Sequence, residues 1–294
     1  MFQRQIFFPL LLIRNFDMNT SKLLKTLLSV GAAGTLSYAV TVFKVNDKQE
    51  PVLADNTRVT WDYNWDKREP VSLINPKKLQ KLAECDDKVG IADLISQYTP
   101  TATRHIFFIR HGQYNQKFKE DELRTLTQLG QEQAVYTGMR LRDLGITFDK
   151  IVESSMTRAI ETSSLIQDQL SKTTVVRTDL LREGSPIEPV PPFRDWRSQI
   201  SVYTDHPRIE SAFRKFVHRA DYTQEKDSYE VVVCHANVIR YIVCRSMQVA
   251  PEAWLRMSLH HGSITLISIH PDGFVTVKSI GEAGHIPKDK LTTS

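Results

Sequence analysis

Cysteine is scarce in this sequence. Cys85, Cys234 and Cys244 are the whole complement among 294 residues, and their spacing does not match a metal-binding pattern. An odd number of widely separated cysteines argues against the disulfide framework on which small secreted domains depend. A reducing compartment therefore fits the chain better than an oxidising one.

The chain also lacks an excess of one charge outside its first residues. Residues 1–46 hold five basic and one acidic side chain, which accounts for the whole net charge of +4. The remainder carries 33 basic and 33 acidic residues out of totals of 38 and 34. A nucleic-acid-binding domain usually carries its basic excess on the domain itself. We therefore expect no nucleic acid among the partners.

Long uncharged runs are confined to the N-terminal part. Residues 26–43 form an uncharged stretch of 18 residues, rich in small side chains, between Lys25 and Lys44. A helix over this stretch would be roughly 27 Å long, just enough to cross a thin bilayer. Residues 6–13 are apolar but too few to span. We therefore expect residues 1–45 to be a targeting and transmembrane segment.

Other features of this N-terminal segment stay open. A cleaved signal peptide or a buried helix is the alternative to an anchor, although a signal peptide would imply secretion, which the odd cysteine count does not favour. Orientation cannot be read, because lysines flank both ends. Translation from Met18 in place of Met1 would give a more compact anchor.

Residues 46–103 are polar and lack sustained periodicity, so we interpret them as a linker, with a short polar helix at 77–93. Within the linker lies Trp-Asp-Tyr-Asn-Trp-Asp-Lys-Arg-Glu, residues 61–69, hereafter the Trp-Asp motif. From spacing alone, packing on the chain's own domain is favoured. Large aromatic side chains in a polar tail also suit docking on another subunit. The candidate oligomerisation residues are Trp61, Asp62, Asn64, Trp65 and Asp66.

From residue 104 onward, apolar runs alternate with helical patterns, which predicts a catalytic domain over 104–294. The alternation indicates an α/β fold with a three-layer, doubly wound, mostly parallel sheet, and ligands at the carboxyl ends of its strands. Strands are predicted at 105–109, 150–153 and 229–233, helices at 127–144, 157–170 and 237–247, and a closing hairpin at 263–269 and 274–280.

Polar residues follow three of these strands. Arg110-His111-Gly112 ends the first strand, Arg158 begins the helix after the second, and His235 follows the third. Arginine offers fixed forks of donors to phosphoryl oxygens, and a helix start adds partial positive charge. A single histidine at a strand end is usually structural, but three such clusters together predict a phosphoryl site.

These residues also carry a resemblance. Arg110-His111-Gly112 after an apolar strand resembles the signature of the histidine phosphatase (phosphoglycerate mutase-like) superfamily. Four segments are similar to its branch of mitochondrial serine/threonine protein phosphatases: Ser-Met-Thr-Arg-Ala-Ile-Glu-Thr at 155–162, Leu-Arg-Glu-Gly-Ser-Pro-Ile-Glu-Pro at 181–189, Cys-His-Ala-Asn-Val-Ile-Arg-Tyr at 234–241, and the Trp-Asp motif. The resemblance runs from about Trp61 to the C-terminus.

The resemblance implies a role for each site residue. His111 would be the nucleophile that becomes phosphohistidine, Glu183 would protonate the leaving group, and Arg110, Arg158 and His235 would hold the phosphoryl oxygens, with His235 also counted as catalytic. Surrounding cations should keep His111 neutral and nucleophilic. Phosphoryl transfer needs mainly positioning and charge stabilisation, so neither a metal nor another cofactor is expected.

The resemblance further implies phosphoserine and phosphothreonine proteins as substrates, a stress-activated kinase kinase kinase as a partner, and a homo-oligomer. It places the chain in a mitochondrial membrane, with the outer membrane favoured and the inner one an alternative. Stress-kinase signalling and mitochondrial quality control would be its context.

Two departures from the superfamily pattern put the substrate range in question. Gln113-Tyr114-Asn115 follows the signature where many members carry a small hydroxyl residue, and Cys234 precedes His235 in place of the commoner glycine. A phosphoglycerate mutase is the alternative enzyme, although Glu183 leads directly into a proline-rich stretch with little room for a second phosphate. A scaffold with residual activity is the alternative outside catalysis.

Overall fold

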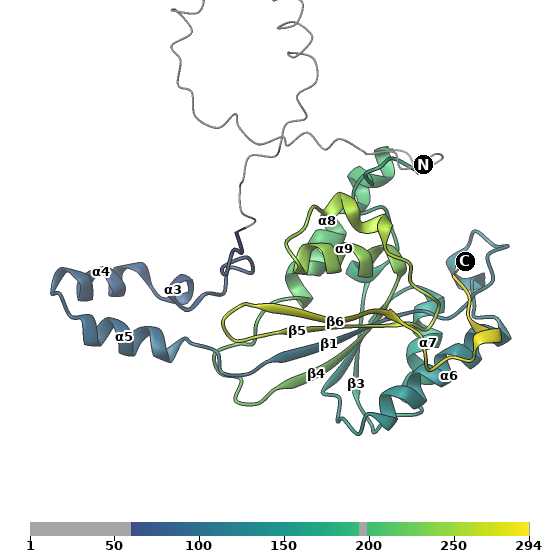
Figure 1. Cartoon of the computed structure of the whole chain (residues 1–294), viewed down its shortest axis with the longest axis horizontal. Helices are drawn as coiled ribbons and strands as arrows, with labels where there is room; N and C mark the ends of the chain where they lie inside the picture. The colour runs from purple at the N-terminus through teal and green to yellow at the C-terminus, as the bar shows by residue number, and fades with distance from the viewer. Residues whose placement is uncertain (1–59, 194–198, 294) are drawn as a thin grey trace, which may run out of the picture. The chain divides into compact units, whose positions relative to one another are not determined.

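Six strands form one mixed sheet at the centre of this computed structural model, which describes residues 60–193 and 199–293 (Figure 1). Their order across the sheet is β3-β2-β4-β1-β5-β6. The first four of these are mutually parallel, whereas β5 is antiparallel to β1 and β6 to β5. The strands are β1 (Arg104–Arg110), β2 (Lys150–Ser154), β3 (Thr174–Thr178), β4 (Ser228–Cys234), β5 (Ile264–Ile269) and β6 (Val275–Glu282).

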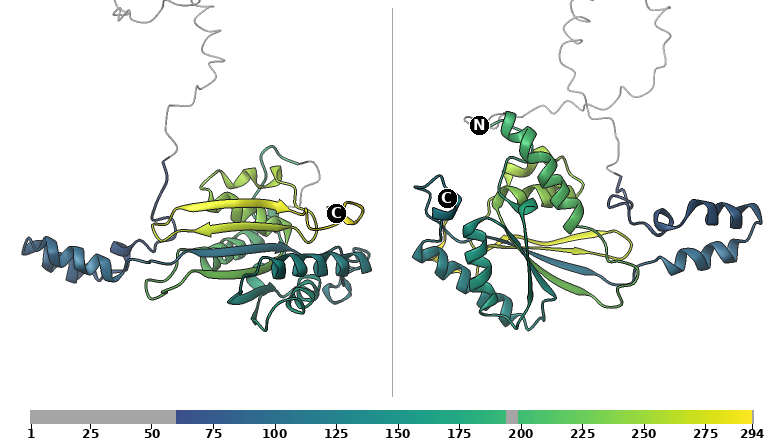
Figure 2. Two further views of the ribbon diagram at one scale, coloured as in Figure 1. Left: turned by 60° about the horizontal axis from the view of Figure 1, so that its bottom comes forward. Right: turned by 180° about the vertical axis from the view of Figure 1, so that it is seen from behind.

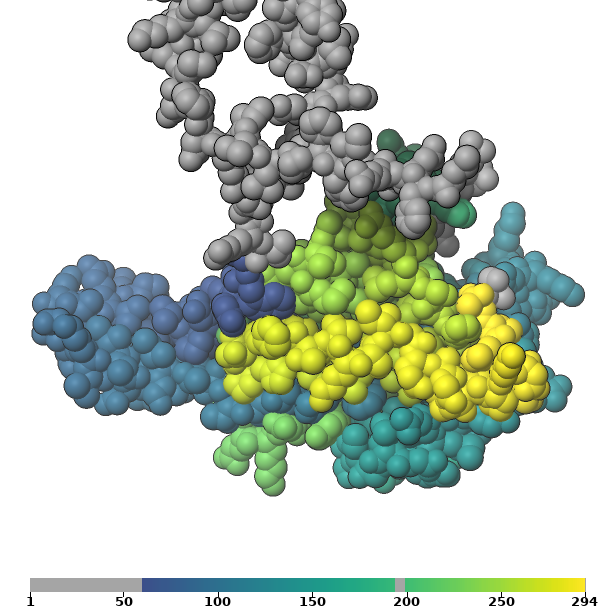
Figure 3. Space-filling view, in the orientation of Figure 1, coloured from purple at the N-terminus to yellow at the C-terminus, as the bar shows by residue number. Residues whose placement is uncertain are grey.

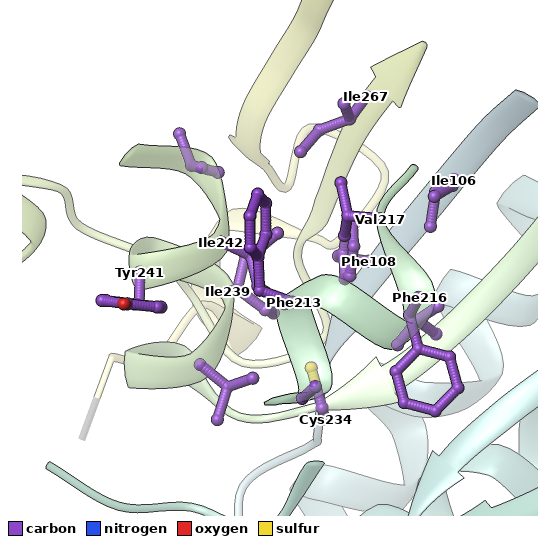
Figure 4. Packing of buried hydrophobic residues seen from close by; sticks show 14 of the residues in the cluster. Ile106, Phe108, Phe213, Phe216, Val217, Cys234, Ile239, Tyr241, Ile242 and Ile267 are labelled. Atoms are coloured by element: carbon purple, nitrogen blue, oxygen red, sulfur yellow. The ribbon is translucent and has the colours of Figure 1, made fainter. Parts of the chain in front are cut away.

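Helices cover both faces of the sheet, as the continuous apolar pattern of β1 predicts. Ile106 and Phe108 pack into a core beneath α8 (Gln199–Phe216) and α9 (Ala236–Ser246) (Figure 4). Phe107 and Ile109 belong to the core on the other face, with residues of α6 (Gln128–Asp143) and α7 (Thr157–Gln167). Figure 2 shows the ribbon from two further sides, with helices on both faces of the sheet. The predicted α/β sheet with helices on both faces is confirmed.

The register of the two central strands determines where the polar clusters meet. In the parallel pair of β1 and β4, Arg110 lies opposite Cys234. The next residues, His111 and His235, therefore leave the carboxyl edge of the sheet side by side. Strand β2 is the other neighbour of β4, and α7 begins three residues after β2 ends.

The helix predicted over 127–144 matches α6 closely at both ends. Thr127 caps α6 through its side-chain oxygen, which accepts from the backbone N–H of Gly130, and Gly145 follows the helix with a φ of +66°. Only a residue that tolerates a left-handed conformation ends a helix in this way, and glycine does so without steric cost.

Among the strands and α-helices that the structure describes after residue 103, β3 and α8 were not predicted. Strand β3 is short, lies at the sheet edge and exposes much of its surface, so it has no continuous apolar run. Helix α8 contains Pro207, which interrupts the helical sequence pattern, yet the helix continues through it. Its apolar face is nevertheless buried, through residues that include Ile209 and Phe213.

The segment that precedes β1 contains more regular structure than the sequence suggests. It holds α3 (Pro70–Leu73), α4 (Pro76–Glu84) and α5 (Lys88–Gln97). Two helices thus stand where one was predicted over 77–93. The break falls at Asp86, which has a φ of +51°, and Asp87, whose side chain caps α5 by accepting from the N–H of Gly90. The boundary predicted at residue 104 stays a prediction.

The Trp-Asp motif packs on the chain's own domain. Asp66 and Arg219 form an ion pair of 2.9 Å in which both side chains are 1% exposed. The Trp65 indole Nε1 donates to the Gly273 carbonyl oxygen at 2.8 Å, and Trp61 stacks at an angle on Phe274. A compact unit of the chain begins at Trp61.

The predicted membrane span at 26–43 lies outside the described residues. Within the parts that are described, none of the helices combines the length and the apolar character that a bilayer crossing needs.

Candidate active site

His111 is the centre of the polar cluster at the carboxyl edge of the sheet. Its side chain is buried, and its Nδ1 lies 2.8 Å from the Gly112 carbonyl oxygen. Arg158 donates from Nε to His111 Nε2 at 3.2 Å. Because a carbonyl accepts and a guanidinium can only donate, Nδ1 carries the proton and Nε2 presents its lone pair. This is the tautomer that a nucleophilic Nε2 requires.

The surroundings keep the His111 imidazole neutral. Burial lowers the pKa of His111 well below its ordinary value of 6.5, and the charges of Arg158 and Arg110 lower it further. Desolvation disfavours the charged imidazolium, and nearby cations disfavour it again. At neutral pH the ring is therefore a base and a potential nucleophile.

Two arginines flank His111. Arg158 is 2% exposed and is the second residue of α7, while Arg110 ends β1 and is also buried. Burial lowers the pKa of Arg110 to about 10, against which the Glu183 carboxylate raises it. Both guanidinium groups thus stay protonated at neutral pH. Both line the same pocket as His111, and they form the cationic side that a phosphoryl site requires.

His235 lies across from His111, with ring centroids 5.0 Å apart. It is fully buried, and its Nε2 lies 2.8 Å from the Ser154 hydroxyl oxygen. That hydroxyl also accepts from the Met156 N–H at 3.3 Å, and we assign its own hydrogen to His235 Nε2. The proton of His235 then sits on Nδ1, which is buried without a hydrogen-bond partner among the described residues. Such a donor is ready for a phosphoryl oxygen.

Glu183 completes the pocket from the loop between β3 and α8. Burial lowers the pKa of Arg110, Arg158 and Arg240, and the negative charge of Glu183 acts in the opposite direction on all three. The backbone of this loop is held in place by Arg208 of α8. That side chain donates to the carbonyl oxygens of Leu180, Arg182 and Glu183.

Tyr114 lines another side of the pocket, next to His111 and two arginines. Its ring meets the His111 ring edge-on at 5.1 Å, and the Arg124 and Arg158 guanidinium carbons lie 4.9 and 4.6 Å from its centroid. Arg124 also donates from Nη2 to the Tyr114 hydroxyl at 2.8 Å. The pocket has a volume of about 300 Å³, and its lining comprises Arg110, His111, Tyr114, Gln116, Arg124, Met156, Arg158, Glu183 and Thr293.

An acidic side chain lies at the start of α7. The Asp121 carboxylate accepts from the Thr157 backbone N–H at 3.1 Å and lies 3.5 Å from Arg158 Nη1. Helix starts and guanidinium groups both attract anions. This position therefore has affinity for negative charge, and the Asp121 carboxylate occupies it.

Four of the predicted site residues line this pocket, namely Arg110, His111, Arg158 and Glu183, and the fifth, His235, lies behind it against the His111 ring. Tyr114, Asp121, Arg124 and His261 adjoin it as well and were not predicted. The sequence feature that could have indicated His261 is the polar pair His260-His261, which lies shortly before β5.

No group of three or more His, Cys, Asp or Glu side chains in the described residues is arranged to hold a metal ion. The positive charge of the pocket comes from guanidinium groups. These residues offer donors to an anion and lack the set of acceptors that a divalent cation requires.

The sequence matches the histidine phosphatase superfamily (branch 1) over residues 106–188 and 191–280. The matched segments contain every pocket residue predicted from the sequence. The chain belongs to this family, and the predictions of that family and of a phosphatase are confirmed.

Among its relatives is the mitochondrial serine/threonine-protein phosphatase PGAM5 of Rattus norvegicus, which is 54% identical over 80% of this chain and 81% of its own length. The protein of the same name from Homo sapiens is 53% identical over 80% of each chain. That of Caenorhabditis elegans is 46% identical over 80% of this chain and 81% of its own.

Proposed function

We propose that this chain is a mitochondrial protein serine/threonine phosphatase that acts through a phosphohistidine at His111. The observation that carries the proposal is the state of His111, a buried neutral imidazole with its Nδ1 proton held by Gly112 and its Nε2 aimed at Arg158. The names of the relatives supply the substrate class and the compartment.

The first half-reaction transfers the phosphoryl group to the enzyme. His111 Nε2 attacks phosphorus, so that a P–N bond forms while the ester P–O bond breaks. The positive charge that develops on the ring is shared with the Gly112 carbonyl through Nδ1–H. Arg158 moves its Nε donor from the ring to a phosphoryl oxygen, where Arg110 and His235 also donate. Glu183 takes up a proton when the anionic phosphoryl group offsets the charge of the neighbouring arginines, and it gives this proton to the departing serine or threonine oxygen.

The second half-reaction releases phosphate. Glu183 is now a carboxylate and accepts a proton from water as that water attacks phosphorus. The P–N bond breaks and its electron pair returns to Nε2. His111 is restored as the neutral tautomer with which the cycle began, and Glu183 is again protonated.

A steady-state assay of the full chain in detergent tests this function. We expect phosphate release from phosphoserine and phosphothreonine peptides, inhibition by orthovanadate, and no loss of activity in excess EDTA. Failure to hydrolyse both peptides would contradict the proposal, as would activity that disappears with EDTA and returns with a divalent ion. Faster phosphate transfer between phosphoglycerates would favour the mutase alternative.

The chain should be held in a mitochondrial membrane, with the outer membrane favoured, by the uncharged span at 26–43. Support comes from the mitochondrial relatives and from the basic residues around the span. The test is extraction with alkaline carbonate. Retention in the membrane pellet is expected, and complete release would contradict an anchor.

Assembly into a homo-oligomer through Trp61, Asp62, Asn64, Trp65 and Asp66 remains a proposal beside their contacts within one chain. It rests on the aromatic content of the motif and the resemblance in the sequence. Replacing both tryptophans with alanine should lower the sedimentation coefficient. Because Trp65 also packs on the core, the melting temperature must be measured in parallel. An unchanged sedimentation coefficient in a folded double variant would confine the motif to its contacts within the chain.

A stress-activated kinase kinase kinase is the proposed protein partner, carried from the family resemblance. A purified kinase of this class should co-sediment with the full-length chain and lose phosphate to it. Absence of both effects would remove this class of partner.

A further inference from the structure

The segment Lys290–Thr293 lies beside the cationic side of the pocket. The Thr293 carbonyl oxygen accepts from Arg110 Nη1 at 2.8 Å, and Thr293 is part of the pocket lining. The segment also contacts α6 through Gln133, and Figure 3 shows the yellow C-terminal part of the chain beside teal residues. There Gln133 donates from Nε2 to the Lys290 carbonyl oxygen at 2.7 Å.

His261 lies between this segment and Arg110. Its Nε2 is 3.0 Å from Arg110 Nη2, and its Nδ1 is 2.8 Å from the Thr292 hydroxyl oxygen. A guanidinium can only donate, so Nε2 accepts and the imidazole proton is on Nδ1. The Thr292 hydroxyl is thus the acceptor that sets the tautomer with which His261 holds Arg110. Its backbone carbonyl adds a further contact by accepting from the His261 N–H at 2.9 Å.

The Thr292 hydroxyl has a second donor, Gln133 Nε2, at 2.9 Å. The Oε1 atom of the same Gln133 accepts from the Gln113 N–H, two residues after His111. Both Gln133 and His261 are fully buried. Loss of the Thr292 hydroxyl would therefore leave two buried donors unpaired, which is the costly way to break a hydrogen bond.

Some N–H groups of Arg110 are used by acceptors within the protein, and others stay available for a ligand. Nη1 is used by the carbonyl oxygens of Leu259 and Thr293, and one N–H of Nη2 by His261. Arg110 Nε is buried and has no partner in the described part of the chain. The guanidinium is thus fixed through one end, while Nε–H and the second N–H of Nη2 stay available for phosphoryl oxygens.

We propose that His261 and Thr292 are positioning residues for Arg110, and that the segment Lys290–Thr293 completes the phosphate-binding side of the pocket. This inference rests on the proposed function, because it assigns to Arg110 the binding of the transferring phosphoryl group. His261 and Thr292 do not touch the substrate. They act by restricting the guanidinium to the orientation in which its free donors face the pocket.

The test replaces the Thr292 hydroxyl in a nearly isosteric way. Thr292→Val should lower kcat/KM for a phosphoserine peptide and weaken orthophosphate binding by calorimetry, each roughly tenfold. Thr292→Ser keeps the hydroxyl and should stay within about twofold of the unchanged protein. Thr276→Val is the matched control. It removes another histidine–threonine hydrogen bond, 3.0 Å from His270 Nε2, at the opposite end of β5, and should change neither quantity.

A double-mutant cycle separates positioning from general damage. In an Arg110→Ala background, Thr292→Val should have no further effect on kcat/KM, because the group that it positions is gone.

Substitutions of His261 test the same positioning role independently. A glutamine amide can both accept from Arg110 and donate to Thr292, so it should retain most of the affinity that His261→Leu loses.

Equal losses from Thr292→Val with and without Arg110 would overturn the proposal, as would unchanged orthophosphate affinity in a folded Thr292→Val protein. Orthophosphate binding requires no turnover, so it tests this inference even if the peptide assay fails. A chain that binds orthophosphate through Arg110 and Thr292 but hydrolyses no phosphopeptide would contradict the proposed function alone.

Discussion

The floor and the wall of the pocket are built in different ways. The floor is made by four buried side chains at or shortly after the ends of β1, β2 and β4, namely Arg110, His111, Arg158 and His235. The wall is made by Tyr114 and Glu183, which stand on loops and are half-buried. Chemistry common to all phosphate esters is thus fixed by the sheet, whereas contacts with the variable part of a substrate come from loops.

The largest expected loss of rate follows from a substitution in the floor of the pocket. Arg158→Ala removes donors to the transferring phosphoryl group, which every substrate shares. We expect it to slow phosphoserine peptide and aryl phosphate hydrolysis equally, by roughly 10²- to 10³-fold. Single-turnover kinetics measure this. A loss below tenfold, or one confined to a single substrate, would show that floor and wall do not divide the work in this way.

The next largest loss of rate should depend on the leaving group of the substrate, which distinguishes the wall from the floor. Glu183→Gln should slow phosphoserine peptide hydrolysis by ~10²-fold or more, because a serine oxygen departs as a basic alkoxide and needs a proton. An activated aryl phosphate leaves as a stable anion and should be affected far less. The comparison requires rapid-mixing experiments in which phosphohistidine formation limits the rate. Equal losses on both substrates would assign Glu183 to pocket shape, and His235 would become the next candidate for the acid.

A smaller effect is expected at Tyr114. Tyr114→Phe keeps the ring against His111 but removes the hydroxyl that accepts from Arg124. The KM for a phosphopeptide should rise by a few-fold while kcat changes little, since a single partly exposed hydrogen bond is worth about 1 kcal/mol. Tyr203→Phe, at a side chain that is 83% exposed, is the control. A large fall in kcat would instead place the Tyr114 hydroxyl in the chemical step.

The buried histidines should also make stability depend on pH. Burial lowers the pKa of His218 to about 4, and of His261 to about 3, from an unfolded value of 6.5. Between those values the unfolded chain binds more protons, so stability is complete above pH 6.5 and decreases as the pH falls. Each such histidine contributes a slope of about 1.4 kcal/mol per pH unit.

The window from pH 6.5 to 5 isolates this effect, because ordinary carboxylates titrate near pH 4. Chemical denaturation across this window should show a falling free energy of unfolding. His218→Gln, outside the pocket, should make the slope shallower. A free energy of unfolding that does not change from pH 6.5 to 5 would contradict neutral buried histidines.

Sequence reasoning predicted the floor better than the wall for a physical reason. A buried strand has a continuous apolar run, and the residues that follow parallel strands meet at one edge, so Arg110, His111 and His235 could be placed together. Glu183 came only from family resemblance. Its position depends on Arg208 and on α8, a helix that Pro207 concealed.

The contacts of Thr292 with His261 and Gln133 join segments far apart in the chain. Periodicity and spacing describe neighbours in sequence, so they give no sign of such contacts. Asp121 and Arg124 were missed for the same reason, because the loop that carries them has no repeating pattern.

The central claim, that His111 becomes phosphorylated, can be tested by trapping the intermediate. The full chain is mixed with a radiolabelled phosphoserine peptide, quenched in alkali within milliseconds and digested for mass spectrometry. The account predicts an acid-labile, alkali-stable phosphoryl group on the peptide that contains His111, and none in His111→Ala. Turnover without a phosphorylated enzyme, or a label on any other residue, would contradict it.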